Sequence, residues 1–387
     1  MRLKSIDYAQ FQGTDREWRL DGLTLGPINL LVGKNATGKT RVLNIINGLG
    51  KLVSGRQKPS ELTTGTYQAT FEHEGRLLHY VLDMHERKVV TEEFRDGERT
   101  LLRRAVGGAG EIFHEKENKM QEFQTPETDA AVVARRDTIQ HRFLEPLGEW
   151  GAGVRHYEFG DKMGRGHIAL LVKGGPEPDP ADVNAVIALL RKGLTDFPDR
   201  FAESVKNDMN RIGYQIEQVG VMAPTDVAVQ IPVGVPLEPL ILFVKERDLP
   251  CFTQQTDMSQ GMFRALSVII HLNYAIIANL PSAILVDDIG EGLDFERSCK
   301  LIDLLRDRAL HTTVQLILST NDRFVMNEVP LAEWSILRRT GGHVRVLNYE
   351  NSAAMFEEFK FTGLSNFSLF EMDFAGALPT EEAVAHE

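Results

Sequence analysis

The first part of the chain alternates between apolar and polar side chains, with the two-residue period of β-strands. Residues 2–11, RLKSIDYAQF, are predicted to form a first strand. Residues 23–33, LTLGPINLLVG, predict a turn followed by a strand that ends at Gly33. The period then becomes that of a helix in residues 40–49, where the apolar positions are Val42, Ile45, Ile46 and Leu49. A strand, a glycine-containing loop and a helix are therefore expected in succession.

A meander of antiparallel strands is predicted over residues 65–105. Tyr67 and Phe71 belong to an alternating run, and the Asp96-Gly97 pair is typical of a hairpin turn. The same region holds histidines among polar and acidic neighbours, namely His73, His79 and His85. Their spacing matches no metal-ligand motif, so a solvated sheet face is preferred over a metal site as the interpretation.

The middle of the chain has a different pattern. Glycine- and proline-rich stretches such as KGGPEPDPAD indicate loops, and helical spacing between residues 182 and 212 indicates helices on either side of Pro198. Strand and helix patterns alternate again after residue 236, in PLILFVKE, residues 261–280, AILVDD, residues 296–309 and VQLILST. The expected regions are an N-terminal lobe (1–110), a mainly helical insertion (111–235), a C-terminal lobe (236–375) and a flexible tail (376–387).

The composition narrows the class of function. Of 387 residues, 42% are hydrophobic and 25% charged, and the formal net charge of −12 excludes a generic nucleic-acid binder. The cysteines, Cys251 and Cys299, have no metal-type spacing, which fits a reducing cytosol. No apolar signal core opens the sequence, and the longest apolar stretch, 265–280, is too short for a membrane span. A cytoplasmic protein without membrane association is expected.

The most specific local signal is GKNATGKT at residues 33–40, which matches the phosphate-loop pattern G-x-x-x-x-G-K-[ST] in full. Gly33 and Gly38 allow the backbone to wrap a phosphate closely, with the helix N-terminus adding partial positive charge. Lys39 would reach the β- and γ-phosphates, and Thr40 would bind Mg²⁺. The predicted nucleotide-binding residues are Gly33, Lys34, Asn35, Ala36, Thr37, Gly38, Lys39 and Thr40. A chance glycine-rich loop is the alternative.

A second motif, SAILVDDIGEGLD at 282–294, joins an apolar run directly to two carboxylates. Asp287, at the end of a buried strand, is the expected partner of Thr40 on Mg²⁺. Asp288 is then the candidate general base, or the group that orients the attacking water. The alternative is structural, because paired acidic residues also cap the helix that follows them.

The stretch DMSQGMFRALSVII, just before the acidic strand, resembles the signature motif of ABC-type ATPases. Ser259, Gln260 and Gly261 would open a helix, and a hydroxyl and an amide at a helix N-terminus make a second phosphate clamp. In the superfamily that this resembles, the clamp reaches the ATP of a neighbouring subunit. GEGLD (290–294) resembles the loop that crosses the dimer interface, with Asp294 as its last acid.

LILSTND (316–322) resembles the next core strand of these proteins, and Asn321 falls where they often have a switch histidine. The motif set and the long insertion are similar to the branch that holds SMC heads, RecF-type repair ATPases and the ATPase modules of OLD-type defence systems. The resemblance covers residues 1–50 and 236–345. It implies an α/β fold: an ABC/SMC-head-like P-loop ATPase core with an N-terminal β-meander and a helical insertion. It also implies ATP and Mg²⁺ as cofactors and a homodimer or higher oligomer through the ATP sites.

Two departures from this branch affect the expected chemistry. Asp288 replaces the usual Glu, and Asn321 replaces the usual His. The Asp carboxylate sits about 1.5 Å farther back, and a misplacement of that size can lower a rate roughly 100-fold. With Lys39, Asp288 and Asn321 as the catalytic residues, slow hydrolysis is expected, and ATP would serve largely to hold a dimer.

The sequence after the STND motif has no Asp-x-Asp pair, so a nuclease domain of the OLD type is not expected, and the insertion has no long heptad repeat. We therefore expect that the ATPase regulates a separate effector protein, a nuclease or toxin. The most plausible setting is bacterial anti-phage defence. One alternative is a DNA-repair or recombination ATPase that clamps DNA directly, for which the candidate basic residues are Arg103, Arg104, Arg135, Arg136, His141 and Arg142. Ordinary solvated charge is the preferred interpretation of that cluster. Another alternative is a nucleotide-dependent scaffold without turnover.

Overall fold

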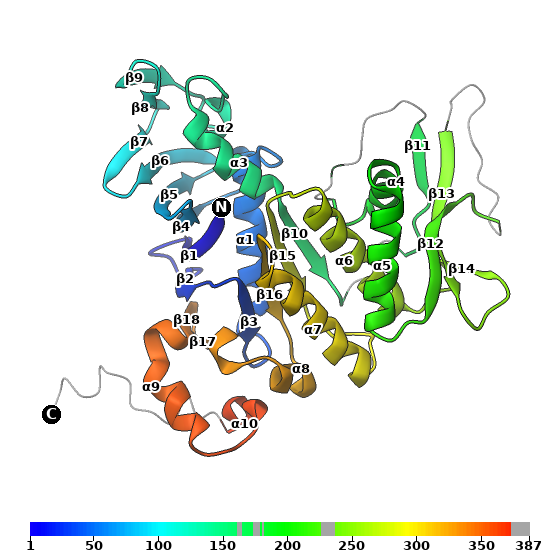
Figure 1. Ribbon diagram of the computed structural model, residues 1–387. Helices are drawn as coiled ribbons and strands as arrows, with labels where there is room; N and C mark the ends of the chain where they lie inside the picture. Colours follow the sequence, from blue (N-terminus) through cyan, green and yellow to red (C-terminus); the bar gives the residue numbers. More distant parts are fainter. Residues whose placement is uncertain (161–164, 173–178, 180–181, 226–236, 373–387) are drawn as a thin grey trace. The chain divides into compact units, whose positions relative to one another are not determined.

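The computed structural model describes residues 1–160, 165–172, 179, 182–225 and 237–372. The chain divides into two compact units, the first made of Met1–Val154 and Ile317–Glu387 and the second of Arg155–Leu316 (Figure 1). The lobe boundaries predicted after residues 110 and 235 stay a prediction. The predicted flexible tail, 376–387, lies outside the described residues.

The first unit is built on a mixed sheet whose strands pair in the order β3-β17-β18-β2-β1-β4-β5-β6-β7-β8-β9. β17 pairs parallel to β3 and β18 parallel to β2, whereas β4 to β9 form an antiparallel meander. The strands are β1 (Arg2–Gln10), β2 (Trp18–Thr24), β3 (Ile28–Val32), β4 (Gly65–His73), β5 (Arg76–His85), β6 (Lys88–Asp96), β7 (Arg99–Arg104), β8 (Ala109–His114), β9 (Lys119–Gln124), β17 (Trp334–Thr340) and β18 (His343–Leu347). β16 (Val314–Ser319) leads from the second unit into the first.

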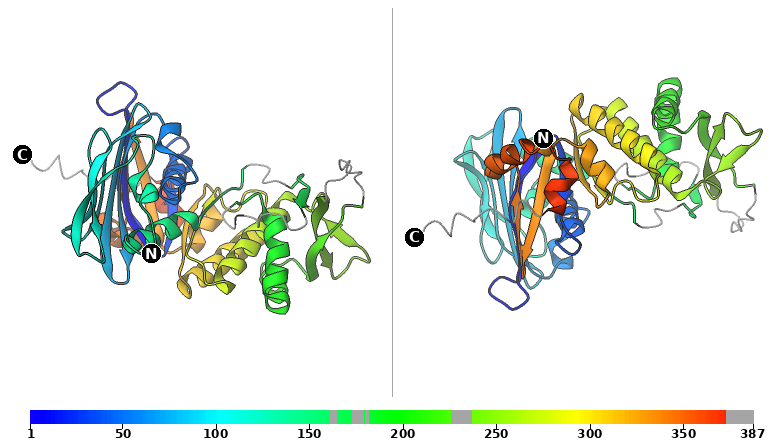
Figure 2. Two further views of the ribbon diagram at one scale, coloured as in Figure 1. Left: turned by 90° about the horizontal axis from the view of Figure 1, so that it is seen from above. Right: turned by 90° about the horizontal axis from the view of Figure 1, so that it is seen from below.

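Helices of the first unit cover the sheet, with α1 along one face of the strands (Figure 2). They are α1 (Lys39–Ser54), α2 (Ala131–Ala134), α3 (Glu145–Ala152), α8 (Arg323–Glu328), α9 (Tyr349–Lys360) and α10 (Asn366–Glu371), with short 3₁₀ turns at Pro59–Glu61, Arg142–Leu144 and Leu331–Glu333. α1 and α3 cross closely, because a Cβ atom on Gly151 would lie 2.6 Å from the carbonyl oxygen of Gly50. Trp150 of α3 packs edge-on against Phe71 of β4, with ring centroids 4.8 Å apart.

The predicted meander is present but extends beyond its expected end. β8 and β9 continue it to Gln124, so β9 and most of β8 lie in the range 111–235 that was predicted to be mainly helical. A buried ion pair fixes the segment after them, since the Glu92 carboxylate lies 3.3 Å from Arg104 Nε. The same carboxylate accepts hydrogen bonds from the amides of Ala131 and Val132 at 2.7 and 3.0 Å. β2 was also missed by the hydrophobic pattern.

The second unit combines helices with a small antiparallel sheet in the order β11-β13-β12, with β14 also paired to β13. Its elements are β10 (Val154–Glu158), β11 (Ala169–Val172), α4 (Val186–Asp196), α5 (Pro198–Arg211), β12 (Ile216–Met222), β13 (Leu237–Glu246), β14 (Phe252–Gln254), α6 (Gln260–Ile277), β15 (Ser282–Asp287) and α7 (Phe295–Leu310). The predicted helices around Pro198 are confirmed. α5 packs on α6 through Phe201 and Tyr274, whose rings meet at right angles 6.2 Å apart. No helix in the described ranges is long and apolar enough to cross a membrane.

Candidate functional site

The loop between β3 and α1 has the backbone that its glycines predict. β3 is buried along its whole length, and α1 begins directly at Lys39. Ala36 and Gly38 have φ angles of 66° and 106°, in the region that glycine adopts most easily. A Cβ atom on Gly33 would lie only 2.4 Å from Thr37 Oγ1, so the wrapped loop requires glycine there. Lys34, Asn35, Ala36 and Thr40 are exposed and therefore accessible to a ligand.

Lys39 connects the phosphate loop to a residue that is distant in sequence. Its side chain is buried, and Nζ donates hydrogen bonds to the Gly33 carbonyl at 2.8 Å and to Asn321 Oδ1 at 2.9 Å. Two of the residues predicted to be catalytic are thus in direct contact within the first unit. The ammonium group lies over the loop, where a charge on a phosphate would be neutralised.

Asn321 is held in place by the elements on either side of it. β16 is fully buried and ends at Ser319, and α8 begins at Arg323. Asp322 caps α8, because its carboxylate accepts hydrogen bonds from the amides of Phe324 at 2.7 Å and Val325 at 3.3 Å. The exposed Asn321 therefore occupies a fixed position between a strand end and a helix start.

Two arginines beside the phosphate loop were missed by the sequence analysis. Arg339 Nη1 donates to the carbonyl of Ala36 at 3.0 Å, and Arg41 lies in the first turn of α1. Arg41 follows the phosphate-loop motif directly, which was a usable signal. Nothing in the sequence around Arg339 points to this contact, because it depends on the parallel pairing of β17 with β3.

The acidic motif ends a buried strand of the second unit, as predicted. β15 is buried throughout, and Asp287 at its end is only 6% exposed. Its carbonyl oxygen accepts a hydrogen bond from the Phe159 amide at 3.1 Å. Asp288 follows with a φ angle of 51°, in the left-handed region that Asp tolerates better than most residues. Asp288 therefore lies in a tight turn, in which its carbonyl oxygen accepts a hydrogen bond from the Glu291 amide at 3.1 Å.

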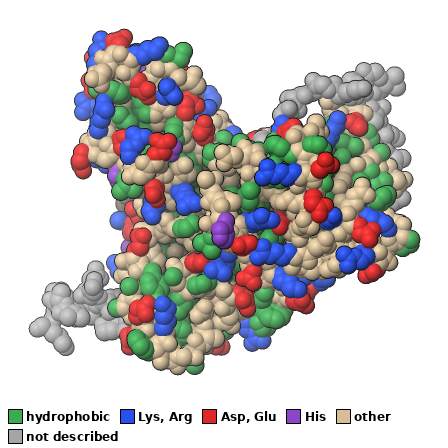
Figure 3. Space-filling model, viewed as in Figure 1, with side chains coloured by type: hydrophobic (Ala, Val, Ile, Leu, Met, Phe, Trp, Pro, Cys, Tyr) green, Lys and Arg blue, Asp and Glu red, His purple; other side chains and the backbone are tan. Residues whose placement is uncertain are grey.

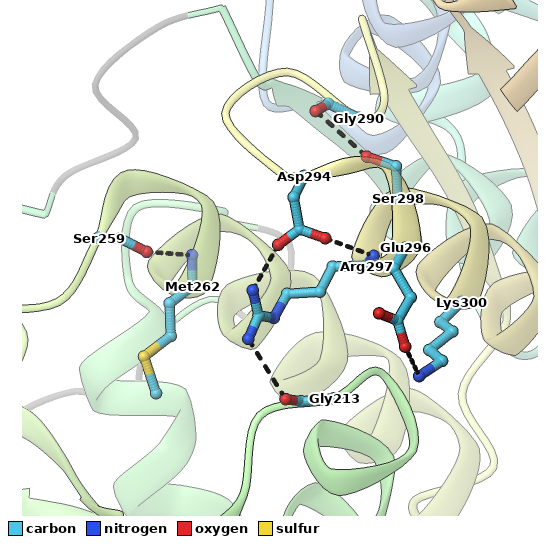
Figure 4. Close-up of polar contacts among 9 residues, drawn as sticks. All are labelled: Gly213, Ser259, Met262, Gly290, Asp294, Glu296, Arg297, Ser298 and Lys300. Carbon is cyan, nitrogen blue, oxygen red and sulfur yellow. Dashed lines mark hydrogen bonds and ion pairs between the residues drawn. The ribbon is translucent and has the colours of Figure 1, made fainter. Parts of the chain in front are cut away.

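The alternative that these acids cap the following helix is wrong. α7 begins at Phe295 and its N-cap is Asp294, whose carboxylate accepts a hydrogen bond from the Arg297 amide at 3.0 Å. Arg297 also forms an ion pair with Asp294 and points a second nitrogen toward the carbonyl of Gly213 at 3.5 Å (Figure 4). The pKa of Asp294 is lowered, first by that backbone amide and then by the guanidinium of Arg297. Asp287 and Asp288 therefore do not cap α7.

The signature stretch opens α6 as predicted. Ser259 is the N-cap, and its Oγ accepts a hydrogen bond from the Met262 amide at 3.1 Å (Figure 4). Ser259 and Gln260 are exposed, whereas Gly261 packs against the backbone of Gly292. Arg264 Nη1 donates to the carbonyl of Glu291 at 2.9 Å. The helix start and the loop before α7 therefore form one packed arrangement.

The predicted magnesium ligands belong to different units. Thr40 is in the first unit and Asp287 in the second, so their pairing on Mg²⁺ stays a prediction. A hydroxyl and a single carboxylate fit the ion, since Mg²⁺ commonly takes one or two protein oxygens together with phosphates and water. Within the described ranges, no group of three or more His, Cys, Asp or Glu is arranged to hold a metal by itself.

Most of the candidate DNA-contacting arginines already have partners within the protein. Arg103 pairs with Glu111 at 2.7 Å, and Arg104 is buried against Glu92. Arg135 donates to Thr125 Oγ1 at 3.2 Å, Arg136 lies 3.8 Å from Glu145, and His141 lies 3.0 Å from Asp137. Basic and acidic side chains are interspersed on the face drawn in Figure 3. These contacts favour structural charge over a continuous phosphate-binding surface.

Comparison with solved structures identifies the fold. A crystal structure of an SMC head bound to the C-terminal winged-helix domain of ScpA matches with a TM-score of 0.52 and 12% sequence identity, covering 90% of this chain and 97% of that one. An SMC head domain with an extended coiled coil, bound to the C-terminal domain of ScpA derived from Pyrococcus furiosus, matches with a TM-score of 0.50 and 10% identity, covering 93% and 99%. No protein-family model and no curated protein sequence matches the chain. The protein thus has a mixed α/β fold that resembles the SMC head domain, with an antiparallel meander in its N-terminal sheet.

Proposed function

We propose that this protein is a slow MgATP-hydrolysing ATPase of the SMC-head type that dimerises on ATP and regulates a separate effector protein. The observation that carries the proposal is the contact of Lys39 Nζ with both the Gly33 carbonyl and Asn321 Oδ1. It combines a wrapped phosphate loop, a buried lysine and the switch position in one place. An SMC-like fold adds support, because that fold is typically an ATPase.

The residues of the first unit bind and orient the nucleotide. The exposed loop 34–36 and the N-terminus of α1 present backbone amides and partial positive charge to the phosphates. Lys39 exchanges its present acceptors for oxygens of the terminal phosphates, and Asn321 remains within reach of the γ-phosphate. Thr40 and Asp287 would hold Mg²⁺, which neutralises charge on the β- and γ-phosphates when it is bound.

Asp288 is proposed to accept the proton of the attacking water, or to orient that water. Its carboxylate is one methylene shorter than that of a glutamate, and its backbone is held in a left-handed turn. Both features restrict how far the carboxylate reaches toward a γ-phosphate. This is the physical reason for proposing slow turnover, with the ATP-bound state lasting long enough to act as a signal.

The second unit is proposed to complete the nucleotide site of another copy. Ser259 and Gln260 are exposed at the start of α6, where the helix N-terminus adds partial positive charge. Asp294 is exposed as well and fixed by Arg297. An exposed serine at a helix N-terminus is suited to a phosphate, and we propose that this phosphate belongs to the ATP of a second copy, in a homodimer or higher oligomer.

The effector and the biological setting are inferred more indirectly. The solved SMC heads named above are bound to ScpA, a separate protein. A partner such as a nuclease or toxin in bacterial anti-phage defence agrees with a chain in which we find no effector motif. Direct DNA clamping in repair or recombination is disfavoured by the internal partners of Arg103, Arg104 and Arg136. The assay below distinguishes a scaffold that does not hydrolyse ATP from both ATPase alternatives.

Steady-state release of phosphate from ATP by the purified protein tests the proposal, with Lys39→Ala as the background. The wild-type rate should exceed that background, and light scattering should detect a dimer with Mg²⁺ and a slowly hydrolysed ATP analogue. If the protein binds ATP but releases phosphate no faster than Lys39→Ala, it is a nucleotide-held scaffold and not an ATPase. A protein that stays monomeric with the analogue would exclude the dimer part, and one that binds no nucleotide would exclude the proposal as a whole.

A further inference from the structure

Arg41 is a cation of the nucleotide-binding region that has only neutral partners. It lies in the first turn of α1, half-buried, with its guanidinium 4.0 Å from the ring centroid of Trp18. Its Nη2 donates to Gln10 Oε1 at 2.6 Å. A ring face and an amide oxygen hold the side chain in place without neutralising its charge.

Arg339 is a second cation that contacts the phosphate loop. It lies at the end of β17, where Nη1 donates to the Ala36 carbonyl at 3.0 Å and Nε donates to the Gly341 carbonyl at 2.7 Å. Both acceptors are neutral. Arg339 is exposed, so its charge faces solvent beside the phosphate loop.

Neither arginine forms an ion pair with a carboxylate in the described part of the chain, although the protein as a whole has a net charge of −12. By contrast, Arg19 on the neighbouring strand β2 pairs with Asp21 at 2.7 Å. The pKa of Arg41 is lowered by its burial and by the positive charge of Arg339. Two cations beside the same loop that have no acidic partner favour the binding of an anion.

We propose that Arg41 and Arg339 form a second anion-binding pair beside the phosphate loop, which binds the phosphate of the nucleotide nearest the sugar. The inference rests on the proposed function and names the part of ATP that these residues bind. Lys39 and Arg41 are two positions apart in α1, so their side chains leave the helix about 200° apart around its axis. Lys39 points to the Gly33 carbonyl and the terminal phosphates, which leaves the other end of the phosphate chain to Arg41. Guanidinium groups suit this role because they bind phosphate oxygens in a bidentate manner.

Calorimetric titration of the full-length protein with ADP and with ATP, in Mg²⁺, tests the pair. Arg41→Ala should weaken both nucleotides by about 10-fold or more and by the same factor, because the phosphate it binds is common to both. Arg339→Ala should weaken both in the same way, and Arg41→Lys should recover part of the loss. Arg19→Ala, which removes an equal but paired charge, should leave both affinities unchanged.

The controls separate this inference from the proposed function. Lys39→Ala should lose nucleotide binding while Arg41→Ala retains a measurable affinity and an unchanged thermal unfolding midpoint. If Arg41→Ala unfolds, Arg41→Gln and Arg339→Ala provide the same comparison. Wild-type affinity in the arginine variants, or a loss confined to ATP, would overturn the pair as a site for the phosphate nearest the sugar. Failure of the wild-type protein to bind ADP and ATP would overturn the proposed function and this inference together.

Discussion

A Cβ atom added to Gly261 would lie 2.2 Å from the carbonyl oxygen of Gly292. This approach joins the N-terminus of α6 to the loop before α7, and only glycine fits at the contact. Ser259 and Asp294, the exposed residues proposed to face a second copy, therefore have a fixed relation within their unit. A substitution at Gly261 should therefore displace Ser259 relative to Asp294 and weaken the proposed dimer contact.

Gly261→Ala should move the start of α6 away from the loop before α7. We expect a loss of about 1–3 kcal/mol in the free energy of unfolding, because the methyl group overpacks a backbone contact. ATP-dependent dimerisation should be lost as well. Light scattering with a slowly hydrolysed ATP analogue and urea unfolding measure the two effects. Gly160→Ala is the matched control, since among the described residues no atom lies within 4 Å of the added Cβ there. Wild-type dimerisation by Gly261→Ala would show that this packing is not needed.

Asp288→Asn and Asp288→Glu should separate turnover from backbone strain. Asn accepts a left-handed φ at least as well as Asp, so Asp288→Asn should retain wild-type stability while losing ATP hydrolysis. Asp288→Glu should extend the carboxylate toward the γ-phosphate and raise the hydrolysis rate. Because Glu fits a left-handed φ less well than Asp, the same variant should lose about 1 kcal/mol of unfolding free energy. Steady-state phosphate release and urea unfolding test each effect. A wild-type rate in Asp288→Asn would remove this residue from the catalytic group.

Stability of the second unit should fall on acidification because of His271. Burial, followed by the positive charge of Arg155, lowers the pKa of His271 to about 4. In the unfolded chain His271 binds a proton near the ordinary histidine pKa, whereas in the folded chain it stays neutral. The free energy of unfolding is therefore unaffected by this residue above the ordinary pKa and falls as the pH decreases toward 4. Between pH 7.5 and pH 5 the loss from this residue is about 2 kcal/mol.

Urea unfolding at the two pH values measures this effect. His271→Gln should be less pH-dependent than the wild type, even if it is less stable at both pH values. His311→Gln, at a site where the side chain is 75% exposed, is the control and should keep the wild-type pH dependence. An unchanged pH dependence in His271→Gln would show that another group is responsible.

The buried pair of Arg104 and Glu92 should be a strong stability determinant of the meander. Arg104→Met leaves the Glu92 carboxylate buried without its cation, which should lower the unfolding free energy by about 3–5 kcal/mol. Burial already raises the pKa of Glu92, so protonation should relieve part of this loss at low pH. Chemical unfolding of the variant relative to wild type at pH 8 and pH 5 checks the sign.

Arg103→Met is the matched control for Arg104→Met, because the neighbouring Arg103 pairs with Glu111 on the surface. It should change the unfolding free energy by less than about 1 kcal/mol. Equal losses in the two variants would mean that burial does not decide the effect.

The DNA-clamping alternative makes an opposite prediction for Arg135 and Arg136. If the internal contacts of these residues are structural, the double variant Arg135→Glu, Arg136→Glu should bind duplex DNA no differently from wild type, with or without ATP. Fluorescence anisotropy at low and moderate salt measures this, because phosphate contacts weaken steeply with salt. A salt-sensitive, ATP-dependent affinity that the double variant loses would restore direct DNA binding.

The parts of the fold that were predictable are those with strong local patterns. The phosphate loop, α6 and β15 follow from a motif or an uninterrupted apolar run, and the structure has them as elements with nearly the predicted bounds. β8 and β9 were missed because most of their side chains are half-buried or exposed. β2 was missed although its buried residues Trp18 and Leu20 alternate with polar neighbours. Their positions depend on pairing with neighbouring strands, which a local pattern does not encode.

The residues of the candidate site that could be predicted are those within a short local motif. Lys39 was predicted from the phosphate-loop motif and lies at the start of α1, and Asp287 was predicted at a strand end and lies at the end of the buried β15. The role of Asp294 as helix cap, in place of Asp287 and Asp288, required knowing where α7 begins. Arg339 could not be found, because its contact with Ala36 joins residues 303 positions apart.

The hydrogen bond between Lys39 and Asn321 means that the phosphate loop has its lysine ordered before any ligand arrives. Fixing a free lysine side chain costs up to about 2 kcal/mol of rotamer entropy. Here the asparagine amide oxygen already holds the ammonium, so an incoming phosphate replaces one acceptor by another in a preorganised site. After the phosphates leave, the same amide oxygen can take the ammonium back. In the proposed function, Asn321 thus returns the lysine to its starting position after the phosphates leave.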